Sequence, residues 1–283
     1  MLNEIEKYAN RSSNSGAKII VENGGNGTLI KKKIYSATQR DYSSLNKQIR
    51  FKQTQFLSSV DILEVNNNNI ELTITMPYEK GLISEKYAER CGFDDVCFIA
   101  DALNDYFRGL IQESIEFELN DIVLKKIKDI ISSLGSKFGT PLYDICISKA
   151  KKIEGELNSM PIYYPHSKCH GDMTLSNLIY RKNDKRIYMI DFLEVYIDSY
   201  LSDYVKLLQD LKYGWSVRFK KEEYKFKHHI MGAAILGRLN VNDSGYDKAV
   251  AILNTINLIR IAPYIKDNIT EQWLTNILKR SEI

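Results

Sequence analysis

The feature that most constrains this chain is a polar loop followed by a hairpin, between residues 169 and 192. The loop reads Cys-His-Gly-Asp-Met-Thr-Leu-Ser-Asn, which places Asn177 five residues after Asp172. Two short apolar runs follow, Leu178–Tyr180 and Ile187–Ile190, with a polar turn between them. Such a pair of runs is typical of a β-hairpin. Its second run leads into Asp191, fourteen residues after Asn177, so we expect the hairpin to bring the two acids and the amide together.

This order of groups is the one that phosphoryl transfer to a hydroxyl uses. One Asp receives the proton of the acceptor hydroxyl, and an Asn and a second Asp hold Mg²⁺. Each part alone is a weak signal, because Asp, Gly and Asn are common in loops of every kind. The complete constellation of H-G-D-x-x-x-x-N, hairpin and apolar-I-D-F is far more specific. It makes Asp172 the candidate catalytic base and Asn177 and Asp191 the candidate metal ligands.

At these residues the sequence resembles the aminoglycoside phosphotransferase and choline kinase group of small-molecule kinases, whose loop reads HGD where protein kinases have HRD. The resemblance implies an α+β, bilobal protein-kinase-like fold, with a small antiparallel β-sheet lobe and a larger, mainly helical lobe. It also implies ATP and Mg²⁺ as cofactors, and a hydroxyl of a sugar, aminoglycoside or amino alcohol as acceptor. The stretches 76–78 and 210–218 look similar to phosphotransferases associated with bacterial cell-surface polysaccharides.

The first third of the chain carries the alternation and turn residues of an antiparallel sheet. The expected strands are residues 1–8, 17–22, 28–35, 61–65 and 70–76. An aperiodic stretch begins at Pro77 and is interpreted as a linker between lobes. We therefore expect a nucleotide-binding lobe over residues 1–77, and a helical lobe with the loop and the acceptor site over residues 78–283.

The resemblance assigns candidate nucleotide contacts in the first lobe. The turn before the second strand, with Ser15 and Gly16, is the candidate phosphate loop, although an ordinary hairpin turn is an equal alternative because no G-x-G-x-x-G is present. Thr28-Leu-Ile-Lys31 aligns with the V-A-I-K pattern of kinases, so Lys31 is the candidate phosphate lysine. Lys33 shares its face of the strand and is the second choice. Tyr78 is the expected backbone donor to adenine, because the preceding proline has no N–H.

One position departs from the kinase pattern. The helix predicted over residues 45–57 contains no acid, and Gln53 stands where a Glu is expected to hold the lysine. An amide can accept a hydrogen bond from lysine but adds no charge. This leaves a nucleotide-binding pseudokinase or scaffold, with little or no transfer activity, as the alternative. A protein kinase is disfavoured, because too few residues separate Asp191 from Asp203 for an activation loop.

Helical periodicity dominates the rest of the chain. The expected helices are residues 94–113, 120–134, 141–157, 203–212, 220–239, 246–264 and 269–283. By resemblance, Asp203 in a D-x-x-K pattern supports the HGD loop; an ordinary acid at a helix start is the alternative. Candidate contacts to the acceptor are Tyr196, Asp198, Asp210, Trp215, Arg218 and Arg260.

Composition excludes several other classes of protein. A net charge of +3 over 283 residues, with no concentrated basic stretch, does not indicate nucleic-acid binding. The four cysteines form no C-x-x-C pair, so neither a zinc site nor a disulfide framework is indicated. No apolar run approaches the ~20 residues of a membrane span, and the N-terminus lacks the pattern of a signal peptide. We expect a cytoplasmic protein.

Overall fold

The computed structural model describes residues 17–24, 27–68, 70–84, 86–241 and 245–281. The chain divides into two compact units, each of which is described by itself. Unit 1 comprises Met1–Gly81 and Ile179–Glu194, and unit 2 comprises Leu82–Leu178 and Val195–Ile283. The hairpin that follows the HGD loop (residues 169–177) therefore belongs, from Ile179 onward, with the N-terminal strands, whereas we expected it within the helical lobe.

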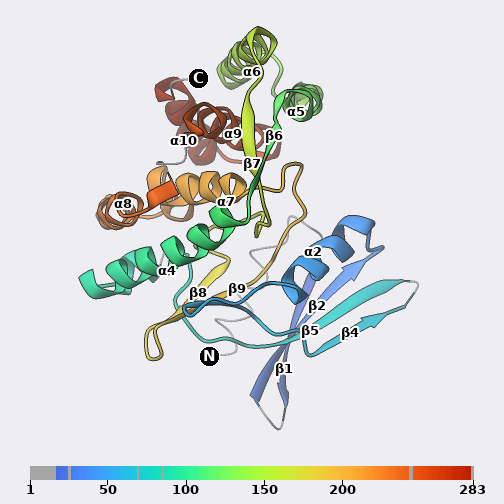
Figure 1. The fold of residues 1–283 in the computed structure, drawn as a ribbon, viewed down its shortest axis with the longest axis vertical. Helices are drawn as coiled ribbons and strands as arrows, with labels where there is room; N and C mark the ends of the chain where they lie inside the picture. The colour runs from blue at the N-terminus through green and yellow to red at the C-terminus, as the bar shows by residue number, and fades with distance from the viewer. Residues whose placement is uncertain (1–16, 25–26, 69, 85, 242–244, 282–283) are drawn as a thin grey trace. The chain divides into compact units, whose positions relative to one another are not determined.

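Unit 1 contains a four-stranded antiparallel sheet in the order β1-β2-β5-β4. Its strands are β1 (Lys18–Gly24), β2 (Gly27–Tyr35), β4 (Glu64–Asn67) and β5 (Glu71–Pro77). The strand expected over residues 1–8 lies outside the described residues. Leu72, Ile74 and Met76 of β5 form a small core with Leu45 of the helix α2 (Gln39–Ile49). Figure 1 shows α2 alongside the strands of this sheet.

Helix α2 is not the helix that the sequence predicted. It begins at a capping box, in which the N–H of Thr38 donates to the Asp41 carboxylate (2.8 Å). It ends at Ile49, so the prediction of a helix over residues 45–57 is wrong for the second half of that stretch. There the chain forms β3 (Leu57–Ser59), which pairs in parallel with β9 (Arg186–Met189). Pairing with a strand more than a hundred residues away overrides the local helical pattern.

The predicted hairpin after the HGD loop is confirmed. Strands β8 (Leu178–Arg181) and β9 are hydrogen-bonded neighbours in a three-stranded sheet of order β3-β9-β8. The linker passes so close to this hairpin that a Cβ at Gly81 would lie 2.7 Å from the Ile179 Cγ2 atom and from the Tyr180 carbonyl oxygen. Only glycine fits such an approach of backbone to backbone.

Unit 2 is mainly helical (Figure 1), and all seven predicted helices are observed with shifted ends. Its α-helices are α3 (Lys86–Arg90), α4 (Phe93–Gln112), α5 (Asn120–Ser133), α6 (Pro141–Ser159), α7 (Tyr200–Leu207), α8 (Glu222–Leu236), α9 (Asp247–Ile259) and α10 (Asn268–Arg280). The structure also describes the strand pair β6 (Ile115–Glu118) and β7 (Tyr163–His166), the π-turn η2 (Leu208–Lys212), and the 3₁₀ turns η1 (Leu134–Lys137), η3 (Trp215–Val217) and η5 (Ala262–Tyr264). None of the helices described is long and apolar enough to span a bilayer.

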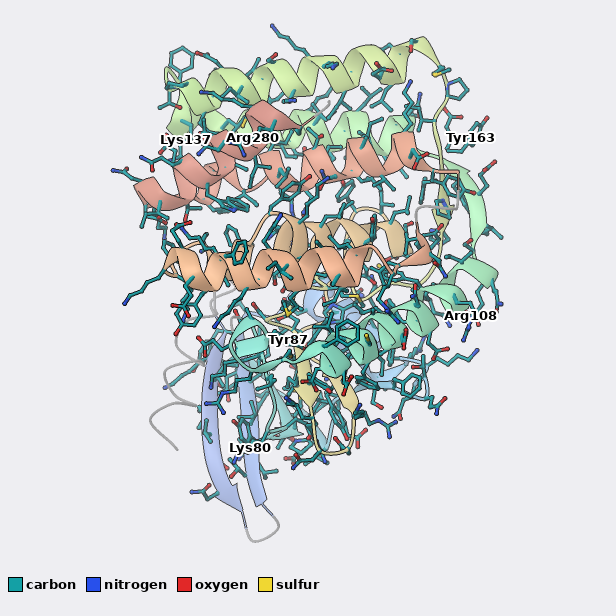
Figure 2. The ribbon with its side chains drawn as sticks, turned by 90° about the vertical axis from the view of Figure 1, so that its left-hand side faces the viewer. Lys80, Tyr87, Arg108, Lys137, Tyr163 and Arg280 are labelled. Atoms are coloured by element: carbon teal, nitrogen blue, oxygen red, sulfur yellow. The ribbon has the colours of Figure 1, made fainter. Side chains whose placement is uncertain are left out.

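The short helix α3 supports the end of the HGD loop. Tyr87, labelled in Figure 2, is fully buried, and its hydroxyl donates to the Leu178 carbonyl (2.8 Å). Just before this helix, the Ser84 N–H donates to the Leu175 carbonyl (2.8 Å). Two carbonyls at the end of the loop are thus held by a segment that precedes it by about ninety residues.

Candidate functional site

In unit 2 the HGD loop is anchored on one buried carboxylate, Asp203 of α7. The backbone N–H groups of His170 and Gly171 donate to its two oxygens at 2.8 and 2.7 Å. The hydroxyl of Tyr106, from α4, donates to the same carboxylate at 2.6 Å. Burial raises the pKa of Asp203, and the His170 side chain together with these three donors opposes that rise. The predicted supporting role of Asp203 is confirmed by these bonds.

The backbone conformation of the HGD loop explains why the second residue of the HGD motif is a glycine. Gly171 has φ = +89°, in the left-handed region that side chains disfavour. This backbone conformation lets two successive N–H groups face Asp203, while the next N–H, that of Asp172, donates to Nδ1 of His170 (3.2 Å). His170 is fully buried. The turn therefore sets the direction in which the Asp172 side chain leaves the loop.

The Asp172 carboxylate lies between a lysine and an amide. Oδ1 is 2.6 Å from the Lys206 ammonium, whose side chain on α7 is only 9% exposed. Oδ2 accepts a hydrogen bond of 3.0 Å from Nδ2 of Asn177, which also donates to the Asp172 carbonyl (2.8 Å). The structure thus brings together two of the three predicted residues, and adds a cation that the sequence analysis did not single out.

The electrostatics favour an ionised Asp172. Burial is the largest influence on its pKa and raises it, but the Lys206 ammonium, Arg260 and His170 together outweigh burial, so the pKa of Asp172 lies below its usual value. About a quarter of the Asp172 side chain remains exposed. This carboxylate is partly accessible and stays charged in neutral solution.

A second buried acid holds the other end of the loop. Asp210 of η2 accepts hydrogen bonds from the N–H groups of Leu175 (2.8 Å) and Ser216 (2.9 Å). Its own carbonyl lies 2.8 Å from Nε2 of His228. Asp210 is fully buried, so our expectation that it contacts the acceptor is wrong. It is a structural partner of the loop.

Arg218, another predicted acceptor contact, is already occupied. Its guanidinium lies 3.6 Å from the centre of the Trp215 ring and donates to the Trp215 carbonyl (2.7 Å). Its Nε donates to the Thr270 hydroxyl (3.2 Å). Stacking and two hydrogen bonds hold Arg218 against its own turn and α10.

In unit 1 the lysine paired with Asp191 is Lys32. Its ammonium lies 2.7 Å from Oδ1 of that residue. Lys31 pairs with Glu22 (2.8 Å) and Lys33 with Glu71 (2.7 Å). The alternation that placed the outer two lysines on one face is observed, but it turns the middle lysine toward Asp191.

The segment that carries Asp191 is held by α2 and by an aromatic contact. Asp191 has φ = +57°, which is uncommon outside glycine and which Asp tolerates better than most residues. Phe192, next along the chain, is buried and its ring lies 5.6 Å from that of Phe51. Lys47 of α2 donates to the Leu193 carbonyl (3.2 Å).

Two more hydrogen bonds join α2 to Glu194, the next residue along the chain. The Glu194 N–H donates to the Ser44 hydroxyl (2.9 Å), and its carbonyl accepts from Arg40 (3.2 Å). Helix α2 thus contacts the Asp191 segment through basic and hydroxyl side chains. In the part of the chain that the structure describes, no acid from this helix pairs with Lys32.

Gln53 is placed away from the lysines. It follows the end of α2, and its carbonyl oxygen accepts hydrogen bonds from the Ser58 hydroxyl (3.3 Å) and from Arg186 (3.5 Å). It therefore does not take the place of the expected Glu. Gln48, which is on α2, is buried and donates to the Val60 carbonyl (2.9 Å).

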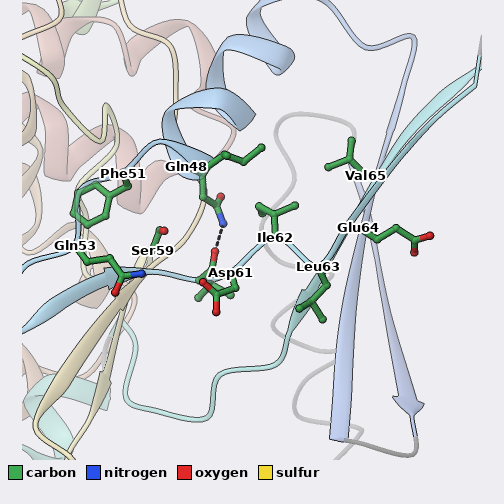
Figure 3. A pocket seen from close by; sticks show the side chains of 11 residues that line it. Gln48, Phe51, Gln53, Ser59, Asp61, Ile62, Leu63, Glu64 and Val65 are labelled. Atoms are coloured by element: carbon green, nitrogen blue, oxygen red, sulfur yellow. Dashed lines mark hydrogen bonds between the residues drawn. The ribbon is translucent and has the colours of Figure 1, made fainter.

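A surface cavity of about 440 Å³ lies in this part of unit 1 (Figure 3). Its walls are the end of α2 and the chain around β3 and β4: Gln48, Ile49, Phe51, Gln53, Ser59, Val60, Asp61, Ile62, Leu63, Glu64 and Val65. Figure 3 shows the bond from Gln48 at its wall. Neither Lys32 nor Asp191 lines it, so this cavity is separate from the candidate site.

The other predicted nucleotide contacts are Tyr78, Ser15 and Gly16. The Tyr78 N–H donates to the Thr28 carbonyl (2.9 Å) and continues the pairing of β2 with β5. This bond occupies the donor that we expected adenine to use. Ser15 and Gly16 lie outside the described residues.

Two donors of the predicted metal site keep oxygen atoms of the right chemistry. Asn177 uses Nδ2 for Asp172, so its Oδ1 is the atom that can face a cation. Asp191 supplies a carboxylate. No three acidic, histidine or cysteine side chains form a metal cage among the residues described. Mg²⁺ bound to phosphates does not need one, because one or two side-chain oxygens, phosphate oxygens and water molecules complete its shell.

Lys206 and Lys32 were the residues that sequence reasoning missed. Lys206 follows Asp203 by three residues, so both lie on one face of α7, and this spacing was the available signal. For Lys32 the pattern gave no signal, because three adjacent lysines match the kinase motif almost equally well.

Comparison with solved structures identifies proteins of the same fold. The GDP complex of wild-type aminoglycoside 2'-phosphotransferase-IIIa matches with a TM-score of 0.59 and 13% identity, over 100% of this chain and 99% of that one. The GDP and kanamycin complex of APH(2")-IIia matches with a TM-score of 0.58 and 13% identity, over 100% and 99%. APH(3'')-Id from Streptomyces rimosus ATCC10970 matches with a TM-score of 0.53 and 12% identity, over 92% and 98%.

No protein-family model matches the sequence, and no curated protein matches it. At identities this low the likeness establishes the fold and leaves the activity open. The expected kinase-like fold, with a small antiparallel-sheet unit and a mainly helical unit, is confirmed.

Proposed function

We propose that this protein transfers the γ-phosphoryl group of ATP, or of another purine nucleoside triphosphate, to a hydroxyl group of a small molecule. The observation that carries the proposal is the state of Asp172. It is a partly exposed carboxylate that Lys206 keeps charged, on a loop whose backbone is fixed by Asp203. The fold likeness to aminoglycoside phosphotransferases, several of them solved with GDP or ADP, is consistent with this chemistry.

Asp172 would orient the acceptor hydroxyl and take its proton as the phosphoryl group arrives. Phosphoryl transfer has a loose transition state, so the oxygen needs little activation before it attacks. A carboxylate of lowered pKa is a weak base but is ionised at every pH near neutral, which suits a group whose main task is positioning. The bond from Asn177 and the ion pair with Lys206 limit the rotation of its side chain.

The predicted metal ligands remain part of the proposal. Mg²⁺, when bound, would neutralise charge on the phosphates. Asn177 would contribute Oδ1 and Asp191 its carboxylate. Lys32, already beside Asp191, would add a positive charge to the phosphate site, in place of the Lys31 that the motif favoured. For adenine, the backbone groups of Glu79 and Lys80 become the candidates, since the N–H of Tyr78 is used within the sheet.

The position of Gln53 weakens the argument for the pseudokinase alternative. It rested on Gln53 in the place of an acid, but Gln53 is not on α2 and bonds to Ser58 and Arg186. Lys32 has a carboxylate partner in Asp191. The alternative would still be correct if the protein bound nucleotide and transferred nothing.

The test is transfer of labelled phosphate from Mg-ATP to a panel of hydroxyl acceptors that includes aminoglycosides, choline, ethanolamine and sugars, neutral and phosphorylated. We expect product with the native protein, and a loss of about 10²-fold or more in rate for Asp172→Ala and Asp191→Ala. Asp129→Ala, on the exposed face of α5, is the matched control. Nucleotide binding without product across the whole panel would favour the pseudokinase.

A further inference from the structure

Arg260 is a cation whose charge acts on Asp172 but which has no role in the proposed mechanism. It follows the end of α9, and its charge influences the pKa values of Asp172, Lys206 and Tyr196. No hydrogen bond or ion pair of its guanidinium occurs among the residues that the structure describes. It is partly exposed. Its charge therefore acts on the candidate base without a carboxylate partner among the described residues.

Helix packing independently places Arg260 near the base. On α9, Asn254 donates to the Tyr213 hydroxyl (2.9 Å), and Asn257 donates to the Val205 carbonyl (3.3 Å) and to Gln209 (3.0 Å). Residues later in α9 thus contact residues earlier in the α7–η2 segment, so α9 runs antiparallel to that segment. Three residues beyond Asn257, and on the same side of the helix, Arg260 therefore lies level with the turn of α7 that carries Lys206.

The other charged groups of this cluster already have partners among the described residues. Asp172 and Lys206 neutralise each other at 2.6 Å. Asp203 is fully buried and its oxygens accept three hydrogen bonds. Asp198, an acid of unit 2 among the predicted acceptor contacts, accepts from the Cys169 thiol (3.3 Å). Arg260 is a cation of this cluster that has no carboxylate partner among the described residues, so a ligand anion can neutralise it.

The surroundings of Arg260 add positive charge. Tyr196, whose pKa burial raises and Arg260 lowers, has the ammonium of Lys126 lying 5.5 Å from its ring centre. A polycationic aminoglycoside bound against Asp172 would bring its ammonium groups toward Arg260 and Lys126, and like charges brought together oppose binding. A phosphate or carboxylate would instead be attracted, and arginine can bind either through two parallel hydrogen bonds.

From this arrangement we infer that the acceptor is an anionic hydroxyl compound, a sugar phosphate or a sugar acid, whose negative group binds Arg260 while its hydroxyl faces Asp172. The inference rests on the proposed function for the role of the hydroxyl. The anion subsite itself does not depend on catalysis.

The test is equilibrium binding by calorimetry to the full chain, with Mg²⁺ and a non-hydrolysable ATP analogue present so that the nucleotide's own phosphate site is filled. The probes are glucose, glucose 6-phosphate, glucuronate and kanamycin. We expect at least one of the two anions to bind about 10- to 100-fold more tightly than glucose, as a charged hydrogen bond allows, and kanamycin to bind more weakly than that anion. The phosphate and carboxylate arms distinguish the two kinds of anion.

Variants then assign the effect to one side chain. Arg260→Gln should bring the anion-to-glucose affinity ratio close to one, and Arg260→Lys should keep part of it. Arg280→Gln is the matched control, because Arg280 is an exposed arginine on the last turn of α10 (Figure 2). Thermal melting of each variant shows that it is folded.

Three results would overturn the anion subsite: equal affinity for glucose and both anions, tighter binding of kanamycin, or a preference for anions that survives in Arg260→Gln. Failure of the proposed function has a different signature. In that case the anion preference and its loss in Arg260→Gln are both seen, but no phosphate moves from Mg-ATP to any acceptor.

Discussion

At the scale of single residues, the contact between Asp172 and Lys206 has the largest consequence. Breaking a buried ion pair by removing one partner leaves an uncompensated charge. The proposed reaction needs Asp172 in this charged form, as the carboxylate. Burial acts to raise its pKa, and Lys206 is the first of the groups that keep it low.

The first prediction concerns Lys206→Met. Above its pKa Asp172 is ionised, so its low pKa keeps the base available as the pH falls. Without the ammonium, burial raises the pKa, and activity should be lost at a higher pH than in the native protein. The pH profile of kcat/KM for phosphate transfer measures this. An acid limb at the same pH in both proteins would show that Lys206 does not control Asp172.

The second prediction separates the adjacent lysines. Lys32→Met removes the partner of Asp191 and should lower kcat/KM for Mg-ATP by about 10²-fold. Lys33→Met also breaks an ion pair, with Glu71, and is therefore a matched control for which we expect little change. Steady-state kinetics with varied ATP distinguishes them. The reverse result would return the phosphate role to the face shared by Lys31 and Lys33.

At the scale of elements, the HGD loop is positioned by α7 and η2. Asp203 and Asp210 accept from N–H groups at the two ends of the loop, and Tyr87 of α3 donates to the Leu178 carbonyl where the loop joins β8. A loop held at so many backbone atoms cannot easily change shape. That rigidity keeps the Asp172 side chain in one position.

The third prediction tests this anchor. Asp203→Asn replaces one acceptor oxygen by an NH₂ group, which faces an N–H of the loop or the Tyr106 hydroxyl and leaves a buried donor unpaired. Such a loss costs about 1–3 kcal/mol of the free energy of unfolding, or about 2–4 °C in Tm for each kcal/mol. Asp129→Asn, on the exposed face of α5, should change Tm little. Equal melting of both variants would mean that Asp203 does not hold the loop.

The fourth prediction concerns the linker at Gly81. An alanine there would place its Cβ 2.7 Å from the backbone carbonyl of Tyr180, which cannot move without disturbing β8. We expect Gly81→Ala to destabilise the fold by about 1–3 kcal/mol, as overpacking does. Gly109→Ala is the control, because a Cβ at that glycine on α4 meets no atom within 4 Å. Denaturant unfolding compares the two; if Gly81→Ala is no less stable than Gly109→Ala, the close approach does not constrain the linker.

At the scale of the whole molecule, unit 1 is made from two separated parts of the chain. Strand β3 pairs with β9, and the facing residues Leu57 and Ile187 are both fully buried. The N-terminal 81 residues alone would lack β8 and β9 and would expose this edge.

The fifth prediction follows because unit 1 is built from two separate chain segments. A fragment of residues 1–81 should show the narrow chemical-shift dispersion of an unfolded or partly folded chain in a ¹H–¹⁵N spectrum. The same fragment joined through a short Gly-Ser linker to residues 179–194 should be better dispersed, because the partner strand is restored. A well-dispersed spectrum from residues 1–81 alone would contradict this account.

Local patterns were sufficient for the elements whose stability is local. The helices of unit 2 follow from apolar spacing, and the hairpin β8–β9 from two apolar runs around a polar turn. The second half of the helix expected over residues 45–57 was predicted wrongly, because the pairing of β3 with β9 is a long-range contact that no local window contains. The role of Asp203 was found by resemblance, and the structure supplied its three hydrogen bonds.

By itself the sequence determined the helices of unit 2 with the longest apolar patterns, the hairpin β8–β9 and the side chains that the HGD loop carries, because spacing along a helix, strand or turn decides which neighbouring side chains share a face. Only the tertiary structure decided which charges meet. Lys206 reaches Asp172 and Lys32 reaches Asp191 because helices and strands distant in sequence pack together. Electrostatic interaction depends on distance in space, and for these pairs that distance is set by packing.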